Sequence, residues 1–81
     1  MANPITFSSR TKKILNSAAE ESRRAGAAMV EPEHLLLGIL LEGQNLASQA
    51  LQSHNINAPE LKDTIRQLRI TRGYQDHFNQ P

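Results

Sequence analysis

Glu31, Glu33 and His34 are the side chains whose types and spacing come closest to a chemical site in this sequence. Carboxylates and an imidazole at such close spacing could share a metal ion, and a carboxylate pair can bind a guanidinium or ammonium group. Both glutamates also suit the start of an expected helix, where the helix dipole favours negative charge, and His34 suits a hydrogen-bonded, partly buried position. We therefore expect no metal here, and we take these three residues as candidates for a protein- or ligand-binding site.

Catalytic chemistry is not indicated elsewhere in the chain. The serines occupy ordinary cap or helix-surface contexts, and the histidines at positions 34, 54 and 77 have no spacing that suggests a nucleophilic triad. No glycine-rich loop is followed by Lys and Ser or Thr, the motif that binds nucleotide phosphates. We predict that the chain is not an enzyme and uses no cofactor, so that any ATP hydrolysis belongs to another polypeptide or to another part of a longer one.

Basic residues recur at three-residue steps at Arg66, Arg69 and Arg72, and could form a basic face with those of residues 10–24. Acidic residues share both segments, no aromatic residue is interleaved for stacking, and the formal charge is only +1. We interpret these residues as a solvated surface and expect no nucleic-acid partner. A helix-turn-helix nucleic-acid-binding regulator is the alternative function, although its recognition helix should be polar rather than aliphatic.

The candidate site stands at the head of the most apolar segment of the chain. Six of the seven positions from Leu35 to Leu41 are large aliphatic residues, which predicts a helix that is buried on nearly all sides. Pro32 suits the first helical position and Gly43 the left-handed conformation at the end. Gly38 lies in mid-helix, where glycine costs about 1 kcal/mol relative to alanine, so we expect a neighbouring helix to approach closely there.

Three further helices are expected around this one. The first has Ser8 as its N-cap and ends at Gly26, the third is capped by Asn45 and ends near Asn55, and the fourth is capped by Asn57. From residue 71 the sequence is polar and contains glycine and a final proline. We predict an all-α bundle of four main helices around a buried central helix, with residues 1–70 as the domain and 71–81 as a polar tail or linker.

The segment EPEHLLLGIL, with Phe7 before a helix ending in EESRRAG and with LASQALQSHNINAPELKDTI downstream, resembles the N-terminal repeat of Clp-type ATP-dependent unfoldases. The resemblance covers residues 5–68 in register. It implies a noncatalytic module that recruits substrates or adaptor proteins to a Clp unfoldase and protease, or that modulates it. The chain would then be either part of an unfoldase subunit or a small stand-alone accessory protein.

In some bacterial members of that family, the glutamate that matches Glu33 helps to hold phosphorylated arginine on substrates. The residue that is usually a neighbouring Thr is Glu31 here, and its carboxylate would repel a phosphate. Asn55 also replaces a glycine that family members usually carry.

The family domain usually packs two such repeats about an approximate two-fold axis, whereas this sequence contains one. A single small domain without cysteines has marginal stability and no disulfide to support it. We therefore predict a homodimer in which a second protomer replaces the second repeat, with contacts at Ala18, Ser22, Leu37 or Leu41.

The apolar run is far shorter than the roughly 20 residues that cross a bilayer, and the N-terminal MANPITFSS lacks the basic and apolar regions of a secretory signal. We expect a cytoplasmic protein without a membrane partner, with the plastid stroma as the alternative location.

Overall fold

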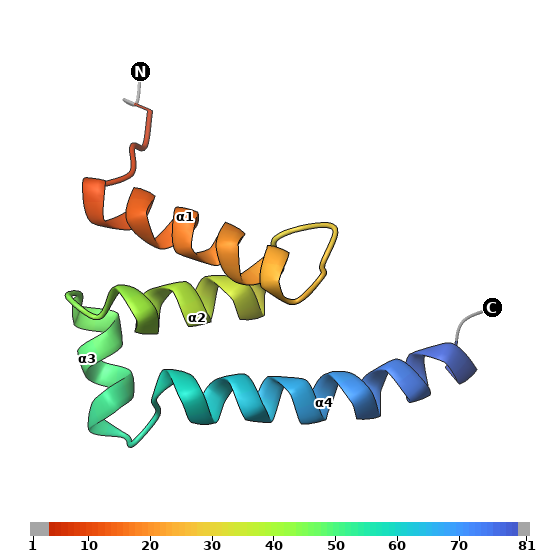
Figure 1. Ribbon diagram of the computed structural model, residues 1–81. Helices are drawn as coiled ribbons and strands as arrows, with labels where there is room; N and C mark the ends of the chain where they lie inside the picture. Colours follow the sequence, from red (N-terminus) through yellow and green to blue (C-terminus); the bar gives the residue numbers. More distant parts are fainter. Residues whose placement is uncertain (1–3, 80–81) are drawn as a thin grey trace.

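The computed structural model describes the backbone of residues 4–79 and the side chains of residues 4–71. It contains four helices in this order: α1 (Ser9–Arg24), α2 (Pro32–Glu42), α3 (Leu46–Ser53) and α4 (Ala58–Asn79). Helix α2 contacts the other three: α1 packs on one side, α4 runs along another, and α3 crosses between the end of α2 and the start of α4 (Figure 1). The predicted all-α architecture with the second helix at its centre is confirmed.

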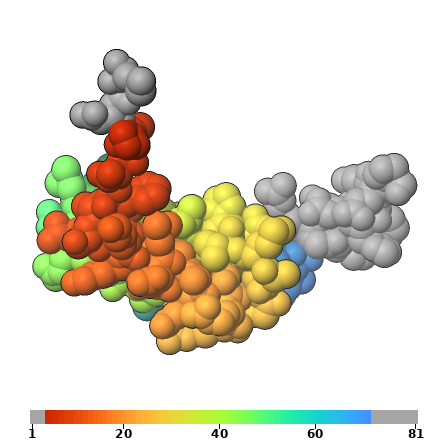
Figure 2. All heavy atoms as spheres, turned by 90° about the horizontal axis from the view of Figure 1, so that it is seen from above, coloured from red at the N-terminus to blue at the C-terminus, as the bar shows by residue number. Residues whose placement is uncertain are grey.

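The boundaries of α1 follow from local chemistry. The Ser8 hydroxyl oxygen accepts a hydrogen bond from the backbone N–H of Thr11 at 3.1 Å, which satisfies one of the free donors at the helix start. After the last turn, Gly26 takes the left-handed conformation with φ 71°. In the view from above, atoms of α1 and of the loop that follows it, orange to yellow, make up much of the described surface (Figure 2).

Helices α1 and α2 approach closely at Gly38. A Cβ atom at this position would lie 2.6 Å from the backbone oxygen of Ile14 and 3.2 Å from the backbone nitrogen of Ala18. Ala18 is fully buried at this contact. The prediction that Gly38 is a packing glycine is confirmed, since any larger residue would meet the backbone of α1.

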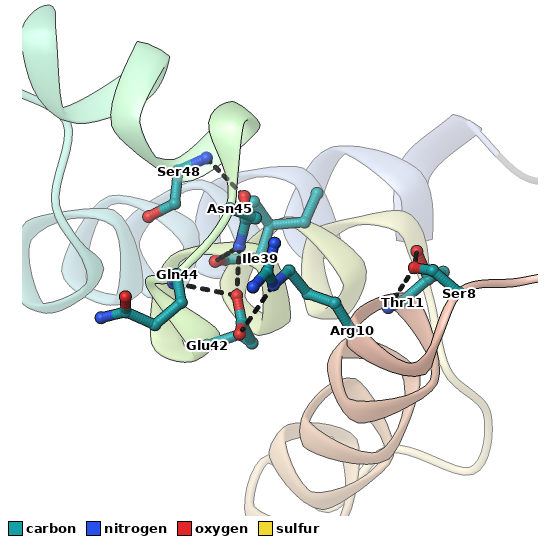
Figure 3. A network of polar contacts seen from close by, with 8 residues as sticks. All are labelled: Ser8, Arg10, Thr11, Ile39, Glu42, Gln44, Asn45 and Ser48. Carbon is teal, nitrogen blue, oxygen red and sulfur yellow. Dashed lines mark hydrogen bonds and ion pairs between the residues drawn. The ribbon is translucent and has the colours of Figure 1, made fainter.

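A polar network fixes the corner between α2 and α3 (Figure 3). The amide oxygen of Asn45 accepts from the backbone N–H of Ser48 at 2.6 Å, and its amide nitrogen donates to the Ile39 carbonyl at 3.0 Å and to the Glu42 carboxylate at 2.7 Å. Glu42 also lies 3.6 Å from the Arg10 guanidinium of α1. Asn45 is thus both the predicted N-cap of α3 and the residue that ties α3 to the end of α2.

Helix α4 extends further than the sequence pattern indicated. Its start is as predicted, because the side-chain oxygen of Asn57 accepts from the backbone N–H of Glu60 at 3.1 Å, and Asn55 before it has φ 63°. The backbone is helical to Asn79, beyond residue 70, where we expected a polar tail or linker to begin. A helix that has already formed gains one hydrogen bond for each residue added, so it can continue without an apolar stripe.

Helix α2 is not buried on all sides, contrary to the sequence-based expectation. Leu37 and Leu40 are buried, but Leu35 is 36% exposed and Leu41 is 44% exposed. The three neighbouring helices cover only part of its circumference, because α3 is short and crosses at one end.

Three of the four residues predicted at a dimer interface lie inside the protomer. Ala18, Ser22 and Leu37 are at most 5% exposed, so they offer no surface to a second copy in this conformation. The small side chains of α1 serve the close approach of α2 instead. Leu41 stays on the surface. Among the described residues, no helix combines the length and the hydropathy needed to cross a membrane.

Candidate functional site

The candidate site is built at the first turn of α2, where the backbone N–H groups have no partner within the helix. Pro32 is the first helical residue and Glu31 the N-cap. The backbone N–H of Glu31 donates to Nδ1 of His34 at 2.8 Å, and the backbone N–H of His34 donates to the Glu31 carbonyl at 2.9 Å. This reciprocal pair fixes the helix start, and it gives His34 the hydrogen-bonded role that the sequence predicted.

His34 is more deeply buried than expected, at 2% exposure. Because Nδ1 accepts a hydrogen bond, the proton of the neutral imidazole lies on Nε2, which is therefore a donor. Nε2 is buried and has no hydrogen-bond partner among the residues whose side chains are described. Buried polar groups are normally paired, so this donor favours an acceptor group as its neighbour.

Glu33 in α2 contacts a cation of α4 that lies 36 positions later in the sequence. Its Oε2 accepts a hydrogen bond from Nη2 of Arg69 in α4 at 3.1 Å, and the side chains are 35% and 45% exposed respectively. A hydrogen bond from the backbone N–H of Glu33 is the main cause that lowers the pKa of its carboxyl group. Partial desolvation opposes this, and the Arg69 guanidinium lowers the pKa further. Glu33 is therefore an ionised carboxylate that already holds a guanidinium group.

Glu31 is exposed at the N-cap, two residues before Glu33, which binds Arg69. The three candidate residues thus lie at one helix end but differ in role. His34 is buried and structural, Glu31 is exposed, and Glu33 is partly exposed. Within the side chains from residue 4 to residue 71, no group of three acidic or histidine side chains is positioned to hold a metal ion.

A second feature adjoins this helix end, namely a cleft of about 380 Å³ between α1, α2 and α4. Among the described residues the backbones of α1 and α4 do not pack together, and long side chains bridge them instead. Glu21, 6% exposed, binds Arg24 at 2.9 Å and Lys62 at 3.4 Å. The charged and polar residues that line the cleft are Glu21, Arg24, His34, Lys62, Arg66 and Arg69.

Sequence reasoning missed both the Glu33–Arg69 contact and this cleft. It interpreted the arginines of the fourth helix as a solvated surface, but Arg69 contacts a residue 36 positions earlier. Only the packing of α4 along α2 brings the two together. The steps of four and three between Lys62, Arg66 and Arg69 do show that they share one helix face, which was the available signal.

The fold and the helix-end site can now be set beside known proteins. Residues 6–77 match the family model of the Clp repeat (R) N-terminal domain. The chain belongs to this family. The match ends beyond residue 70, well into the part of α4 that the sequence pattern had not placed in the domain.

The similar proteins are much longer than this Clp repeat. It is 42% identical over 65 residues to the ClpA homologue of Cyanidium caldarium, a Clp protease ATP-binding subunit, covering 80% of this chain and 8% of the relative. It is also 42% identical over 65 residues to the chloroplastic chaperone ClpC2 of rice, covering 80% of this chain and 7% of that protein. Over 68 residues it is 29% identical to ClpC/MecB of Bacillus subtilis, covering 84% of this chain and 8% of that relative. No solved structure matches this chain.

The chain therefore spans about 8% of the length of these relatives, and it corresponds to their repeat domain rather than to the whole ATP-binding subunit.

Proposed function

We propose that this chain is a noncatalytic protein-binding module of a Clp unfoldase system, which recruits substrates or adaptor proteins or modulates the machine. Membership of the Clp repeat family supports an association with a Clp unfoldase system, and the site at the start of α2 supports the protein-binding role. The observation that carries the proposal is the Glu33 carboxylate bound to the Arg69 guanidinium at 3.1 Å. The helix-turn-helix alternative is dropped, because the chain belongs to a different family.

The ligand chemistry that we propose is a guanidinium or ammonium group of a partner protein, held by Glu33 with Glu31 beside it. Arg69 then acts as an internal occupant that the ligand displaces. An exposed ion pair contributes only about 0–1 kcal/mol, so this exchange costs little. The carboxylate of Glu31 disfavours a phosphorylated group and favours an unmodified cationic side chain.

The test uses a fluorescein-labelled arginine-containing peptide and measures its binding by anisotropy. Glu33→Ala should weaken binding while it changes the free energy of unfolding by no more than roughly 1 kcal/mol, the size of a helix-dipole effect. Glu60→Ala is the matched control, since Glu60 also lies in the first turn of a helix but outside this site. Arg69→Gln should strengthen binding, because it removes the internal occupant.

Unchanged peptide binding by Glu33→Ala, together with reduced stability, would mean that Glu33 only stabilises the helix end. Equal weakening by Glu33→Ala and Glu60→Ala would mean that the peptide responds to overall charge rather than to this site.

We further propose that the 81-residue chain forms a homodimer through its uncovered apolar side chains. Leu41 at 44% and Leu46 at 81% exposure lie on either side of the α2–α3 corner and are its candidate contacts. Light scattering at micromolar concentration should give a mass near twice 9.0 kDa, and Leu41→Lys should lower it toward 9.0 kDa. A strict monomer with cooperative unfolding would refute the dimer. We propose that the module lies in the cytoplasm or, because the similar rice protein is chloroplastic, in the plastid stroma.

A further inference from the structure

The cleft between α1, α2 and α4 adjoins the carboxylates at the start of α2 but differs from them, because its lining is mainly cationic. Among the described residues, Arg24, Lys62, Arg66 and Arg69 line it, against one carboxylate, that of Glu21. We propose that this cleft binds an acidic peptide segment of a partner protein, through the carboxylates of Asp or Glu side chains. The proposal rests on the proposed function only in taking the partner to be a protein.

Not all of these cations are available to a ligand. Glu21 is buried between Arg24 and Lys62, at 2.9 Å and 3.4 Å, and neutralises much of their charge. Arg66 is only loosely paired, at 3.8 Å from Asp63, with both side chains about two-thirds exposed. A guanidinium has five N–H donors, so Arg66 keeps most of its hydrogen-bonding capacity.

Arg69 is likewise only partly used. Among the described residues, its contact from Nη2 to one oxygen of Glu33 uses one of its donors. Arg66 and Arg69 therefore offer two guanidinium groups at the cleft, with the Lys62 ammonium beyond them on the same helix face. Guanidinium groups bind carboxylates in pairs of parallel hydrogen bonds, which is the strongest contact of this kind.

The spacing of the cations favours an extended peptide. At a rise of ~1.5 Å per residue, Lys62 and Arg66 are about 6 Å apart along the axis of α4, and Arg66 and Arg69 about 4.5 Å. Alternate side chains of an extended chain lie ~6.6 Å apart on one face. Two carboxylates in a Glu-x-Glu pattern can thus reach two of these cations at once, whereas a single phosphate cannot span the row.

His34 provides an independent reason to expect an acceptor in the cleft. It lines the cleft, and its Nε2 donor is buried without a partner among the described residues. A carboxylate that reaches this imidazole would satisfy the donor. The cations attract the acidic segment, and the imidazole favours its insertion toward α2.

The experiment measures the anisotropy of a fluorescein-labelled peptide of alternating Glu and Ser with the full chain, at low salt and at about 0.15 M salt. Arg66→Gln should weaken binding about fivefold, the effect of an exposed charge contact. Arg23→Gln is the matched control: Arg23 is an exposed arginine of α1 that does not line the cleft, and its loss should leave binding unchanged. In ¹⁵N spectra, the His34 imidazole signals should shift as the peptide is added.

Equal weakening by Arg66→Gln and Arg23→Gln would overturn the proposal, because it would show attraction by overall charge. Inorganic phosphate that displaces the peptide at similar concentration would also overturn it and would leave a simple oxyanion site.

Glu33→Ala separates this proposal from the proposed function. It should weaken binding of the arginine-containing peptide but not of the acidic one. If the parent protein binds the arginine-containing peptide in a Glu33-dependent way but does not bind the acidic peptide, the proposal for the cleft is refuted and the proposed function is not.

Discussion

Replacement of Gly38 by alanine tests the packing of α1 on α2 with a single methyl group. At an uncrowded helix position, this change stabilises a protein by about 1 kcal/mol, because alanine has the higher helix propensity. Here the new Cβ would lie 2.6 Å from the Ile14 backbone oxygen and 3.4 Å from the Ala18 Cβ. The gain in helix propensity and the cost of overpacking have opposite signs, so the sign of the change in the free energy of unfolding shows which one dominates.

The magnitude follows from what the methyl group meets. Ordinary carbon contacts begin near 3.5 Å, so α1 must move away by several tenths of an ångström or more, and its backbone cannot adapt by a change of rotamer. Overpacking of this kind costs about 1–3 kcal/mol. With the propensity gain of about 1 kcal/mol subtracted, we expect a net loss of up to about 2 kcal/mol. For a domain of this size that is a fall in melting temperature of up to about 15 °C.

The assay is urea and thermal unfolding followed by circular dichroism. Gly38→Leu should lose more stability than Gly38→Ala, because it places a whole side chain at the contact. Ala50→Gly is the control for propensity alone: Ala50 is exposed in α3, and its replacement should cost no more than about 1 kcal/mol. If Gly38→Ala were as stable as the parent or more so, the close approach of α1 would not constrain this position.

Two further predictions concern single side chains. Because the pKa of Glu33 is lowered in the folded state, its ionised carboxylate stabilises the fold above the pKa of the unfolded chain, and this contribution is lost as the pH falls through the folded pKa. The urea midpoint should therefore drop in acid by more for the parent than for Glu33→Gln. Equal drops for the two proteins would contradict this. Asn45→Ala should lower the free energy of unfolding by about 1–2 kcal/mol, since it removes the α3 cap and the hydrogen bonds to Ile39 and Glu42. The control Asn16→Ala, on the exposed surface of α1, should leave the free energy of unfolding unchanged. Similar urea midpoints for the two variants would contradict the role of the network.

The sequence by itself determined the four helices and their ends, except the end of α4. Ser8, Asn45 and Asn57 each accept a hydrogen bond from the backbone N–H three residues later. Gly26 and Gly43 take left-handed conformations that glycine adopts easily. These interactions lie within one turn of chain, so the residue types specify them without knowledge of the fold. The same holds for the motif at the start of α2, which indicated the Clp repeat family.

Tertiary structure alone decided which side chains face the core, the surface and one another. The apolar stripes predicted that α2 has partners, but not that its neighbours would leave Leu41 uncovered and bury Ala18 within the protomer. The contact of Glu33 with Arg69 and the cationic cleft arise from the placement of α4 along α2, between residues more than thirty positions apart. Such contacts depend on the relative position of whole helices, which is set by the summed packing of many side chains and has no local sequence signal.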